Sequence, residues 1–151
     1  MQLVPAQSVY AVISPPAESQ VLAFIASANN SLDVMLYQFS HSPFKTALVQ
    51  AVARGVRVRL ILEPKVDSNL ATAEFLNARG VEVRWASQEF ANTHAKTAVA
   101  DGFCALVGSI NWSRHAALLN REIALVACNF PAVQEIQRVF EQDWGKATPA
   151  R

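Results

Sequence analysis

His94 and Lys96 stand one residue apart in an apolar, strand-like segment of the chain. Side chains at this spacing point to the same face of a β-strand, so the imidazole and the ammonium are expected to lie side by side. Ser109 and Asn111 show the same spacing after the next apolar run, and Glu122 begins a further one. Together these side chains are suited to binding and transferring a phosphoryl group. Their types and spacing are not those of residues that only stabilise a fold.

Each of these groups has a role in cleaving a phosphodiester. The His94 imidazole can attack phosphorus to form a phosphohistidine, which divides one difficult displacement into two easier ones. The leaving oxygen needs a proton from a group with a pKa near neutrality, and a second histidine is the natural donor. Lys96 can neutralise the phosphate, while Ser109 and Asn111 can donate hydrogen bonds to its oxygens. Glu122 is expected to hold the imidazole and set its tautomer.

No metal or other cofactor is expected for this chemistry. The cationic side chains supply the neutralising charge, and the sequence has no acidic cluster of the kind that binds Mg²⁺ for phosphoryl transfer.

Four further positions belong to the same pattern. Gly108 precedes the serine and Asn120 stands two residues before the glutamate, and both are candidates for substrate binding. Asp101 and Gly102 form an Asp-Gly turn signal between the two apolar runs. An aspartate in such a turn more often bonds to turn amides than takes part in chemistry, so we predict a structural role for this pair.

Basic residues near the carboxyl ends of parallel strands are candidates for holding a flanking phosphate. Arg59 and Lys65 fit this position best, whereas most arginines of the predicted strands are expected to be surface charges. His41 and His115 fall in loops outside the pattern and are expected to be exposed, with a place at the rim of the pocket as the alternative for either. Trp112 directly follows the predicted site and is a candidate to line its entrance.

Length and composition indicate one compact globular domain spanning residues 1–151 and carrying one copy of the pattern. Hydrophobic residues make up 52% of the chain and charged residues 17%, which excludes a disordered protein. The net charge is only +1, so a nucleic acid would have to be held by a local basic patch. Cys104 and Cys128 lie in apolar runs and are expected to be buried thiols.

No apolar run approaches the roughly 20 residues that span a bilayer, so no transmembrane segment is expected. The absence of a signal-peptide pattern favours the cytoplasm, with a periplasmic or secreted location open for a trimmed chain.

Hydrophobic periodicity predicts alternating strands and helices. Strands are expected over 9–13, 32–39, 56–62, 81–85 and 121–128, with a hairpin over 94–111. Helices are expected from residues 17, 43, 69 and 131, the last with Trp144 on its buried side and a frayed end over 146–151. Alternation through residue 85 implies right-handed crossovers, so the predicted fold is α/β, a three-layer α/β/α sandwich with a mixed, largely parallel sheet.

The pattern of chemical residues resembles the phospholipase D superfamily. Its signature is His-x-Lys-(x)4-Asp-Gly, the HKD motif, followed by Gly-Ser-x-Asn and Asn-x-Glu, and this chain carries all three in order. The strand ending Tyr37-Gln38-Phe39 and the closing helix extend the resemblance over nearly the whole chain. Members with one motif are similar to half of the two-motif enzymes and build their site as a symmetric homodimer. Since His94 is the one histidine of three inside the motif, the resemblance implies such a homodimer here.

The implied activity is that of a metal-independent phosphodiesterase. The chain resembles the small single-motif bacterial Nuc-type endonucleases. This resemblance favours hydrolysis of nucleic acid, DNA in particular, with little readout of the bases. One alternative is a phospholipid-acting enzyme, a phospholipase D or a cardiolipin hydrolase or synthase, with this chain as one half of a two-motif protein. A non-catalytic nucleic-acid-binding module is the other. The motif recognises only the phosphodiester, so it does not distinguish DNA, RNA and phospholipid.

Overall fold

The computed structural model describes residues 6–151, which form one eight-stranded sheet and five helices. The strands are β1 (Ser8–Ser14), β2 (Ser31–Leu36), β3 (Arg57–Leu62), β4 (Glu82–Trp85), β5 (Lys96–Ala100), β6 (Cys104–Gly108), β7 (Glu122–Cys128) and β8 (Thr148–Pro149). The helices are α1 (Glu18–Ser27), α2 (Ser42–Ala53), α3 (Ser68–Asn77), α4 (Arg114–Leu118) and α5 (Pro131–Lys146). All the predicted strands and helices are present, and the structure adds the short α4 and β8.

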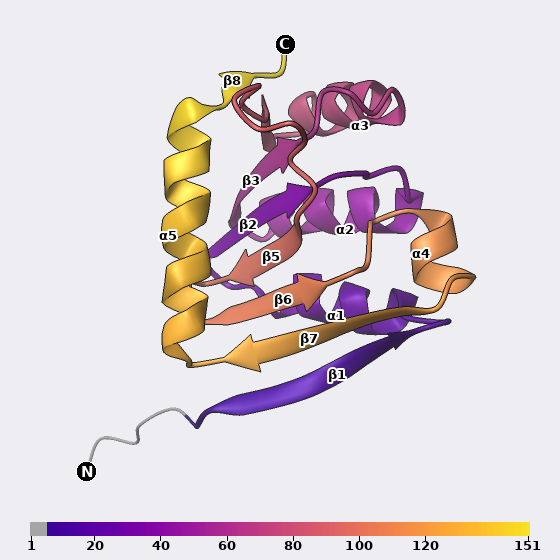
Figure 1. The fold of residues 1–151 in the computed structure, drawn as a ribbon, viewed down its shortest axis with the longest axis vertical. Coiled ribbons are helices and arrows are strands. Elements are labelled where there is room, and N and C mark those ends of the chain that lie inside the picture. The colour runs from indigo at the N-terminus through magenta and orange to yellow at the C-terminus, as the bar shows by residue number, and fades with distance from the viewer. Residues whose placement is uncertain (1–5) are drawn as a thin grey trace.

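The sheet has the strand order β1-β7-β6-β5-β2-β3-β4-β8. Strand β3 pairs in parallel with β2 and β4, and the other five of the seven pairings are antiparallel. The mixed α/β sheet is confirmed, but the prediction of a largely parallel sheet is wrong. Beyond residue 85 no crossover helix separates β4 from β5, so the chain continues as an antiparallel meander of β5, β6 and β7 (Figure 1).

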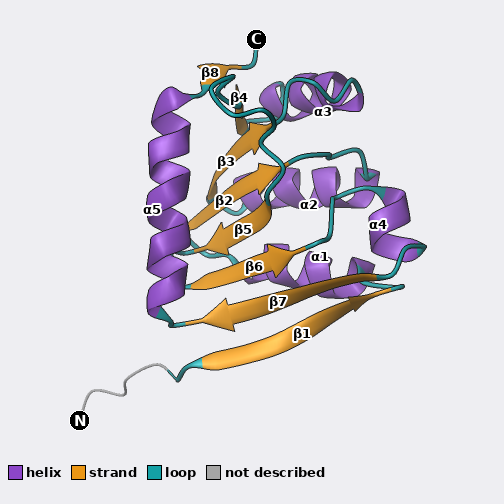
Figure 2. Cartoon of the chain, viewed as in Figure 1, coloured by secondary structure: helices purple, strands orange, loops and turns teal. Residues whose placement is uncertain are grey.

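Helices cover both faces of the sheet unequally. Helices α1, α2 and α3 lie behind the sheet in the view of Figure 2. Helix α5 packs on the other face and runs along the left-hand ends of the strands, and the short α4 lies at the right. The larger core lies between the sheet and α1–α3, and its strand residues alternate along β2 and β3. Smaller apolar clusters form under α5, where the buried Phe140 and Trp144 pack on Met35 and Ile61. Trp144 therefore lies in a core, as predicted, and part of the front face has no helix over it.

Arg59 binds α5 to the sheet. Its side chain is 7% exposed and donates to Asp33 (2.8 and 3.0 Å) and to Glu141 of α5. Burial opposes the charged form, but the hydrogen bonds and charges of Asp33 and Glu141 raise the pKa of Arg59 above its ordinary value. The guanidinium is fully engaged inside the fold. The prediction that Arg59 holds a flanking phosphate is therefore wrong.

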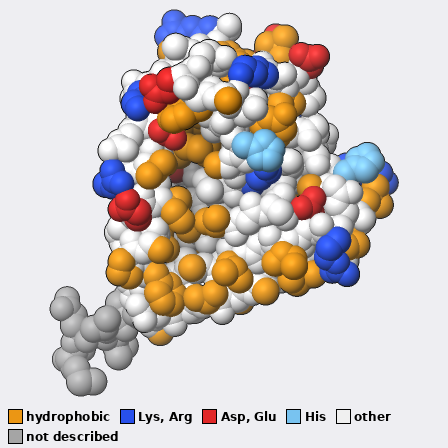
Figure 3. Space-filling model, viewed as in Figure 1, with side chains coloured by type: hydrophobic (Ala, Val, Ile, Leu, Met, Phe, Trp, Pro, Cys, Tyr) orange, Lys and Arg blue, Asp and Glu red, His pale blue; other side chains and the backbone are white. Residues whose placement is uncertain are grey.

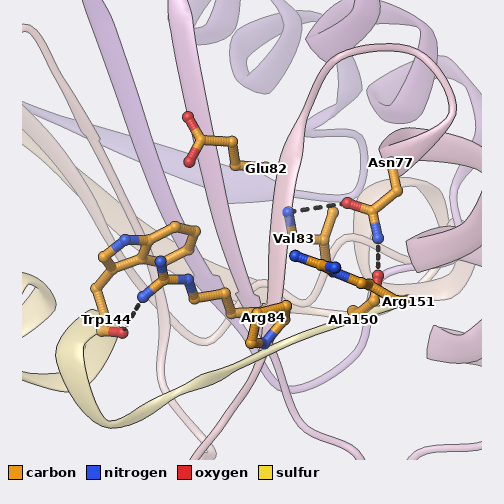
Figure 4. A pocket seen from close by; sticks show the side chains of 8 residues that line it. Asn77, Glu82, Val83, Arg84, Trp144, Ala150 and Arg151 are labelled. Atoms are coloured by element: carbon orange, nitrogen blue, oxygen red, sulfur yellow. Dashed lines mark hydrogen bonds between the residues drawn. The ribbon is translucent and has the colours of Figure 1, made fainter.

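The carboxyl end of the chain is bound to the sheet instead of frayed. Strand β8 pairs with β4, and Asn77 donates to Ala150 O and accepts from Val83 N (Figure 4). Arg84 stacks on Trp144 and donates to its carbonyl at 2.8 Å. These residues line a cavity of about 400 Å³ at the β4–β8 edge, three strands away from β5.

The two cysteines form a disulfide, which corrects the prediction of buried free thiols. Cys104 and Cys128 are directly opposite each other in the register of β6 and β7. Sequence alone does not give this register. The disulfide could therefore not be predicted from two apolar runs that each contain one cysteine. Within residues 6–151 no helix is long and apolar enough to cross a bilayer.

We expect the disulfide to contribute measurably to stability, because it closes a loop between residues 24 positions apart. Loop-closure entropy predicts that the double variant Cys104→Ala/Cys128→Ala is less stable by about 3 kcal/mol, or roughly 10 °C in Tm. Thermal melts of the wild type with and without reductant, beside the double variant, measure this. Equal Tm values for the oxidised and reduced wild type would contradict it.

Candidate active site

The antiparallel pairing of β5 with β2 brings the predicted site to the carboxyl end of β2. Lys96 at the start of β5 is opposite Leu36 at the end of β2, and Tyr37 N donates to Ala95 O at 3.2 Å. His94 therefore lies on the loop that enters β5, beside the segment that leaves β2.

His94 and Lys96 are in direct contact, as their spacing predicts. The Lys96 ammonium lies 2.8 Å from His94 Nδ1 and donates to the His94 carbonyl, also at 2.8 Å. His94 is exposed and Lys96 half-buried. Partial burial lowers the pKa of Lys96, and the nearby negative charge of Glu122 acts in the opposite direction. Lys96 thus places a cation beside the His94 imidazole, a potential nucleophile, and a ligand can reach this pair from solvent.

Tyr37 is a site residue that the sequence analysis missed. Its ring centroid lies 4.4 Å from the His94 ring, and the Lys96 ammonium lies 5.6 Å from the same tyrosine ring. The aromatic ring thus forms a wall behind both groups. The sequence placed Tyr37 on a predicted strand, but only the pairing of β2 with β5 shows that it reaches His94.

Ser109, Asn120 and Glu122 form a second group next to this pair. The Ser109 hydroxyl donates to Glu122 Oε1 at 2.7 Å, and Asn120 Nδ2 lies 3.3 Å from Glu122 Oε2. The charge of Glu122 also acts on Lys96, which links the two groups electrostatically. No hydrogen bond joins Glu122 to His94 within the described chain. The prediction that Glu122 holds the imidazole is therefore not met inside one subunit.

Asn111 is anchored to the loop after β2. Its Oδ1 accepts from Gln38 N at 3.3 Å, and the neighbouring Trp112 exchanges backbone hydrogen bonds with Gln38 and His41. The Trp112 side chain is buried against Phe39 at a centroid distance of 5.2 Å. Trp112 therefore holds two site loops together from inside, and the prediction that it lines the entrance is wrong.

Gly108 and Lys65 are the remaining substrate-binding candidates. A Cβ at Gly108 would lie 2.4 Å from Ile123 O and from Ala124 Cα, so close approach of β6 and β7 accounts for this glycine. Lys65 is exposed and donates to Ala91 O, on the loop that leads to His94. Lys65 is thus bonded to the loop that precedes His94, whereas Gly108 has a packing role.

The two other histidines differ from each other. His41 was expected to be exposed, but it is 7% exposed, with Nε2 2.6 Å from Glu18 Oε2 and its ring against Phe44. Its position at the start of α2 places it over α1, so burial follows from helix packing. His115 is exposed on α4, as predicted. Among residues 6–151 no group of three His, Cys, Asp or Glu side chains is placed to hold a metal ion.

Asp101 and Gly102 lie at the opposite end of β5 from His94, roughly 20 Å away at the rise of a strand. Both have positive φ, 58° and 62°, as a tight Asp-Gly hairpin turn requires. The Asp101 carboxylate accepts backbone N–H bonds from Asn29, Asn30 and Ser31 at 2.7–3.1 Å. These contacts join the hairpin to the α1–β2 connection. They agree with a structural role for Asp101, but the donors are these amides and not the amides of its own turn that the sequence predicted.

A family model described as "Cardiolipin synthase, PLD-like domain" matches residues 21–144, which include the whole of this site. The chain belongs to the phospholipase D superfamily. Among solved structures of phospholipase D family members, Nuc from Salmonella typhimurium superposes with a TM-score of 0.89 at 27% identity. The match covers 95% of this chain and 98% of Nuc. NucT from Helicobacter pylori gives a TM-score of 0.87 at 18% identity, over 95% of this chain and 99% of that one.

Several similar sequences in the phospholipase D superfamily are named as enzymes of the phospholipid cardiolipin. The mitochondrial cardiolipin hydrolase of Xenopus tropicalis is 34% identical over 139 residues, and the match covers 89% of this chain and 64% of that protein. The minor cardiolipin synthase ClsB of Bacillus subtilis is 27% identical over 147 residues, 92% of this chain and 36% of that protein. The chain thus spans under two thirds of the length of these relatives.

Asp101→Ala should lower stability by about 1–2 kcal/mol at pH 7, because three backbone donors lose their acceptor. Partial burial alone would raise the pKa of the Asp101 carboxyl, but the N–H donors of Asn30, Ser31 and Asn29 outweigh burial and lower it. A lowered folded-state pKa means that the stabilisation is complete above the ordinary aspartate pKa and is lost as pH falls through the folded value.

Denaturant unfolding at pH 7, 5 and 3 measures this effect. The gap between wild type and Asp101→Ala should be full at pH 7 and 5 and smaller at pH 3. A gap that stays constant over this range would contradict the assignment.

Proposed function

We propose that this chain is a metal-independent phosphodiesterase that acts through a phosphohistidine at a site shared by two copies of the chain, with nucleic acid as its substrate. The observation that carries this proposal is the contact between His94 and Lys96 on an exposed surface. Ser109 and Asn111 lie on the segment after β6, and Glu122 lies at the start of β7. This set supplies a nucleophile, a cation and hydrogen-bond donors to one phosphate.

The reaction has two displacements. An imidazole nitrogen of His94 forms a bond to phosphorus, the bond from phosphorus to one ester oxygen breaks, and that oxygen takes a proton from the partner's imidazole. Water then attacks the phosphohistidine, gives its proton to the partner's imidazole and releases the free His94 and a phosphomonoester. Lys96 offsets the phosphate charge in both steps, and its partial burial strengthens this interaction.

One chain has only half of the groups that these steps require. His94 is the single histidine in the site, because His41 is buried beside Glu18 and His115 is on α4. Its imidazole also has no carboxylate partner within residues 6–151. A second copy across a twofold axis would supply both a proton donor and a carboxylate.

A surface suited to a second copy adjoins the site. Apolar side chains gather over β1, β6 and β7 on the front of the molecule (Figure 3). We call this surface the open sheet face and define it by five exposed residues, Val9, Ile13, Val107, Ile123 and Leu125. They are neighbours in the register of three strands. Ile123 O accepts from the backbone N of Ser109 in the site, and Ile123 N donates to the Ser109 hydroxyl. A contiguous apolar patch of this kind is typical of an interface.

Nucleic acid is the substrate that we favour. Lys65 donates to Ala91 O on the loop that leads to His94, and a cation there can meet a flanking phosphate of a polymer. Superposition with Nuc over 98% of its length supports the same assignment.

A phospholipid substrate is the second candidate. An apolar groove of about 180 Å³ lies between β5 and α5 and is lined by Met35, Ala95, Ile136, Val139 and Phe140, among others. Ala95 stands between His94 and Lys96 in the sequence, so the groove borders the segment that carries both groups, on the face of β5 that packs on α5. The 34% identity with a cardiolipin hydrolase favours this candidate.

His94→Ala should lower phosphodiesterase activity by at least about 1,000-fold, because no other group replaces the nucleophile. The assay compares single-stranded DNA, duplex DNA, RNA and a fluorescent cardiolipin in EDTA, with His115→Ala as the matched control that keeps wild-type activity. Cleavage of lipid alone would reject the nucleic-acid substrate. Full activity of His94→Ala would reject the mechanism.

Leu125→Glu should dissociate the proposed pair and abolish activity, because a charge would be buried at the centre of the open sheet face. Leu70→Glu is the matched control, since Leu70 is 57% exposed on α3, behind the sheet. Sedimentation and activity are measured together over a range of concentrations. A wild type that is monomeric and fully active would contradict the shared site.

A further inference from the structure

Glu63 is a buried carboxylate that none of the proposed steps uses. It follows β3 directly and is only 1% exposed. Its backbone N donates to Leu36 O at 3.3 Å, at the end of β2, and its carbonyl accepts from Asn69 Nδ2 at 2.9 Å. Glu63 therefore lies at the edge of the sheet where the site loops meet.

The Glu63 side chain binds the loop that carries His94. Its Oε2 accepts from Thr93 N at 2.7 Å, and Thr93 is itself buried at 7% exposure. The next residue, His94, is exposed. The bond to Glu63 is thus the last anchor in the protein interior before the chain emerges at the nucleophile.

A second buried side chain, Asn69, links Glu63 to Tyr37, the aromatic residue beside the His94 imidazole. Asn69 Nδ2 donates to Tyr37 O as well as to Glu63 O, both at 2.9 Å, and Asn69 Oδ1 accepts from Phe39 N at 2.9 Å. Tyr37 contacts the His94 ring. Two buried polar side chains, Glu63 and Asn69, therefore hold the backbone before His94 and the backbone of the tyrosine beside it.

The second carboxylate oxygen of Glu63 indicates that stability does not explain a glutamate at this position. Glu63 Oε1 is buried and has no hydrogen-bond partner among residues 6–151. A buried polar atom in this state destabilises the fold, so stability alone does not favour a carboxylate at this position. What the carboxylate provides is a fixed position for Thr93. Thr93 lies within residues 86–95, which contain neither helix nor strand.

We propose that Glu63 is a positioning residue of the phosphodiesterase site, whose buried carboxylate fixes the main chain at Thr93 and thereby the placement of the His94 imidazole. This inference rests on the proposed function. Reactive geometry has a narrow tolerance, and a displacement of about 1 Å can lower a rate by on the order of 100-fold.

The test compares Glu63→Leu, which keeps the approximate volume and removes the acceptor, with Glu63→Gln, which keeps an acceptor oxygen and removes the charge. The substrate is bis-p-nitrophenyl phosphate in EDTA, because it contains neither a base nor an acyl chain. We expect Glu63→Leu to lower kcat by roughly 10- to 100-fold with KM within about threefold of wild type. Glu63→Gln should restore kcat to within about threefold.

Asp33→Leu is the matched control, because Asp33 is an equally buried carboxylate that binds Arg59 under α5, away from the site. It should lower Tm and leave kcat unchanged at temperatures well below melting. A purely structural role for Glu63 would give the same result in Glu63→Leu, and that outcome would overturn the proposal.

Amide hydrogen exchange at Thr93 provides a readout independent of turnover. Exchange should be slow in the wild type and Glu63→Gln and at least about tenfold faster in Glu63→Leu. Unchanged protection in Glu63→Leu would also overturn the proposal. If the wild type shows no hydrolysis that depends on His94, the proposed function fails, and Thr93 exchange still reports whether Glu63 holds this loop.

Discussion

Strand β2 pairs in parallel with β3 and antiparallel with β5, and this change of direction decides where each candidate site group lies. The carboxyl ends of β2 and β3 meet the amino end of β5 at one edge of the sheet. In a fully parallel sheet β5 would start at the opposite edge, and His94 would be separated from Tyr37 and Glu63. The antiparallel meander is therefore what assembles the site.

Charge is distributed over the fold with a clear division of roles. Arg59 and Asp101 are occupied by structural partners, the first under α5 and the second at the far hairpin. Lys96 is left at the exposed edge, where burial is partial and Glu122 is near. The site thus keeps a cation whose main polar neighbour is the imidazole itself, which is the arrangement a bound phosphate needs.

The secondary structure and the reactive side chains could be predicted from the sequence. The register of the strands and the burial of individual side chains could not. A run that is apolar on both faces located β2, alternation located β3, and apolar residues at helical spacing located α5. The motif spacing predicted the contact between His94 and Lys96. The disulfide could not be predicted, because it depends on which residues are opposite each other in β6 and β7. The burial of Trp112 and the role of Glu63 depend on loops that meet only in three dimensions. Alternation shows which face of a strand a residue occupies, but not what lies over that face.

The open sheet face adjoins the candidate site, since Ile123 of the face is bonded to Ser109, and in the proposed pair a second copy would cover this face. In a symmetric pair every substitution on this patch enters the assembly twice, once from each side of the axis. A change that weakens the contact by a given factor per subunit therefore acts as the square of that factor. Neutral drift should be slow on this patch and faster over α3, where Leu70 is equally exposed but belongs to no proposed interface.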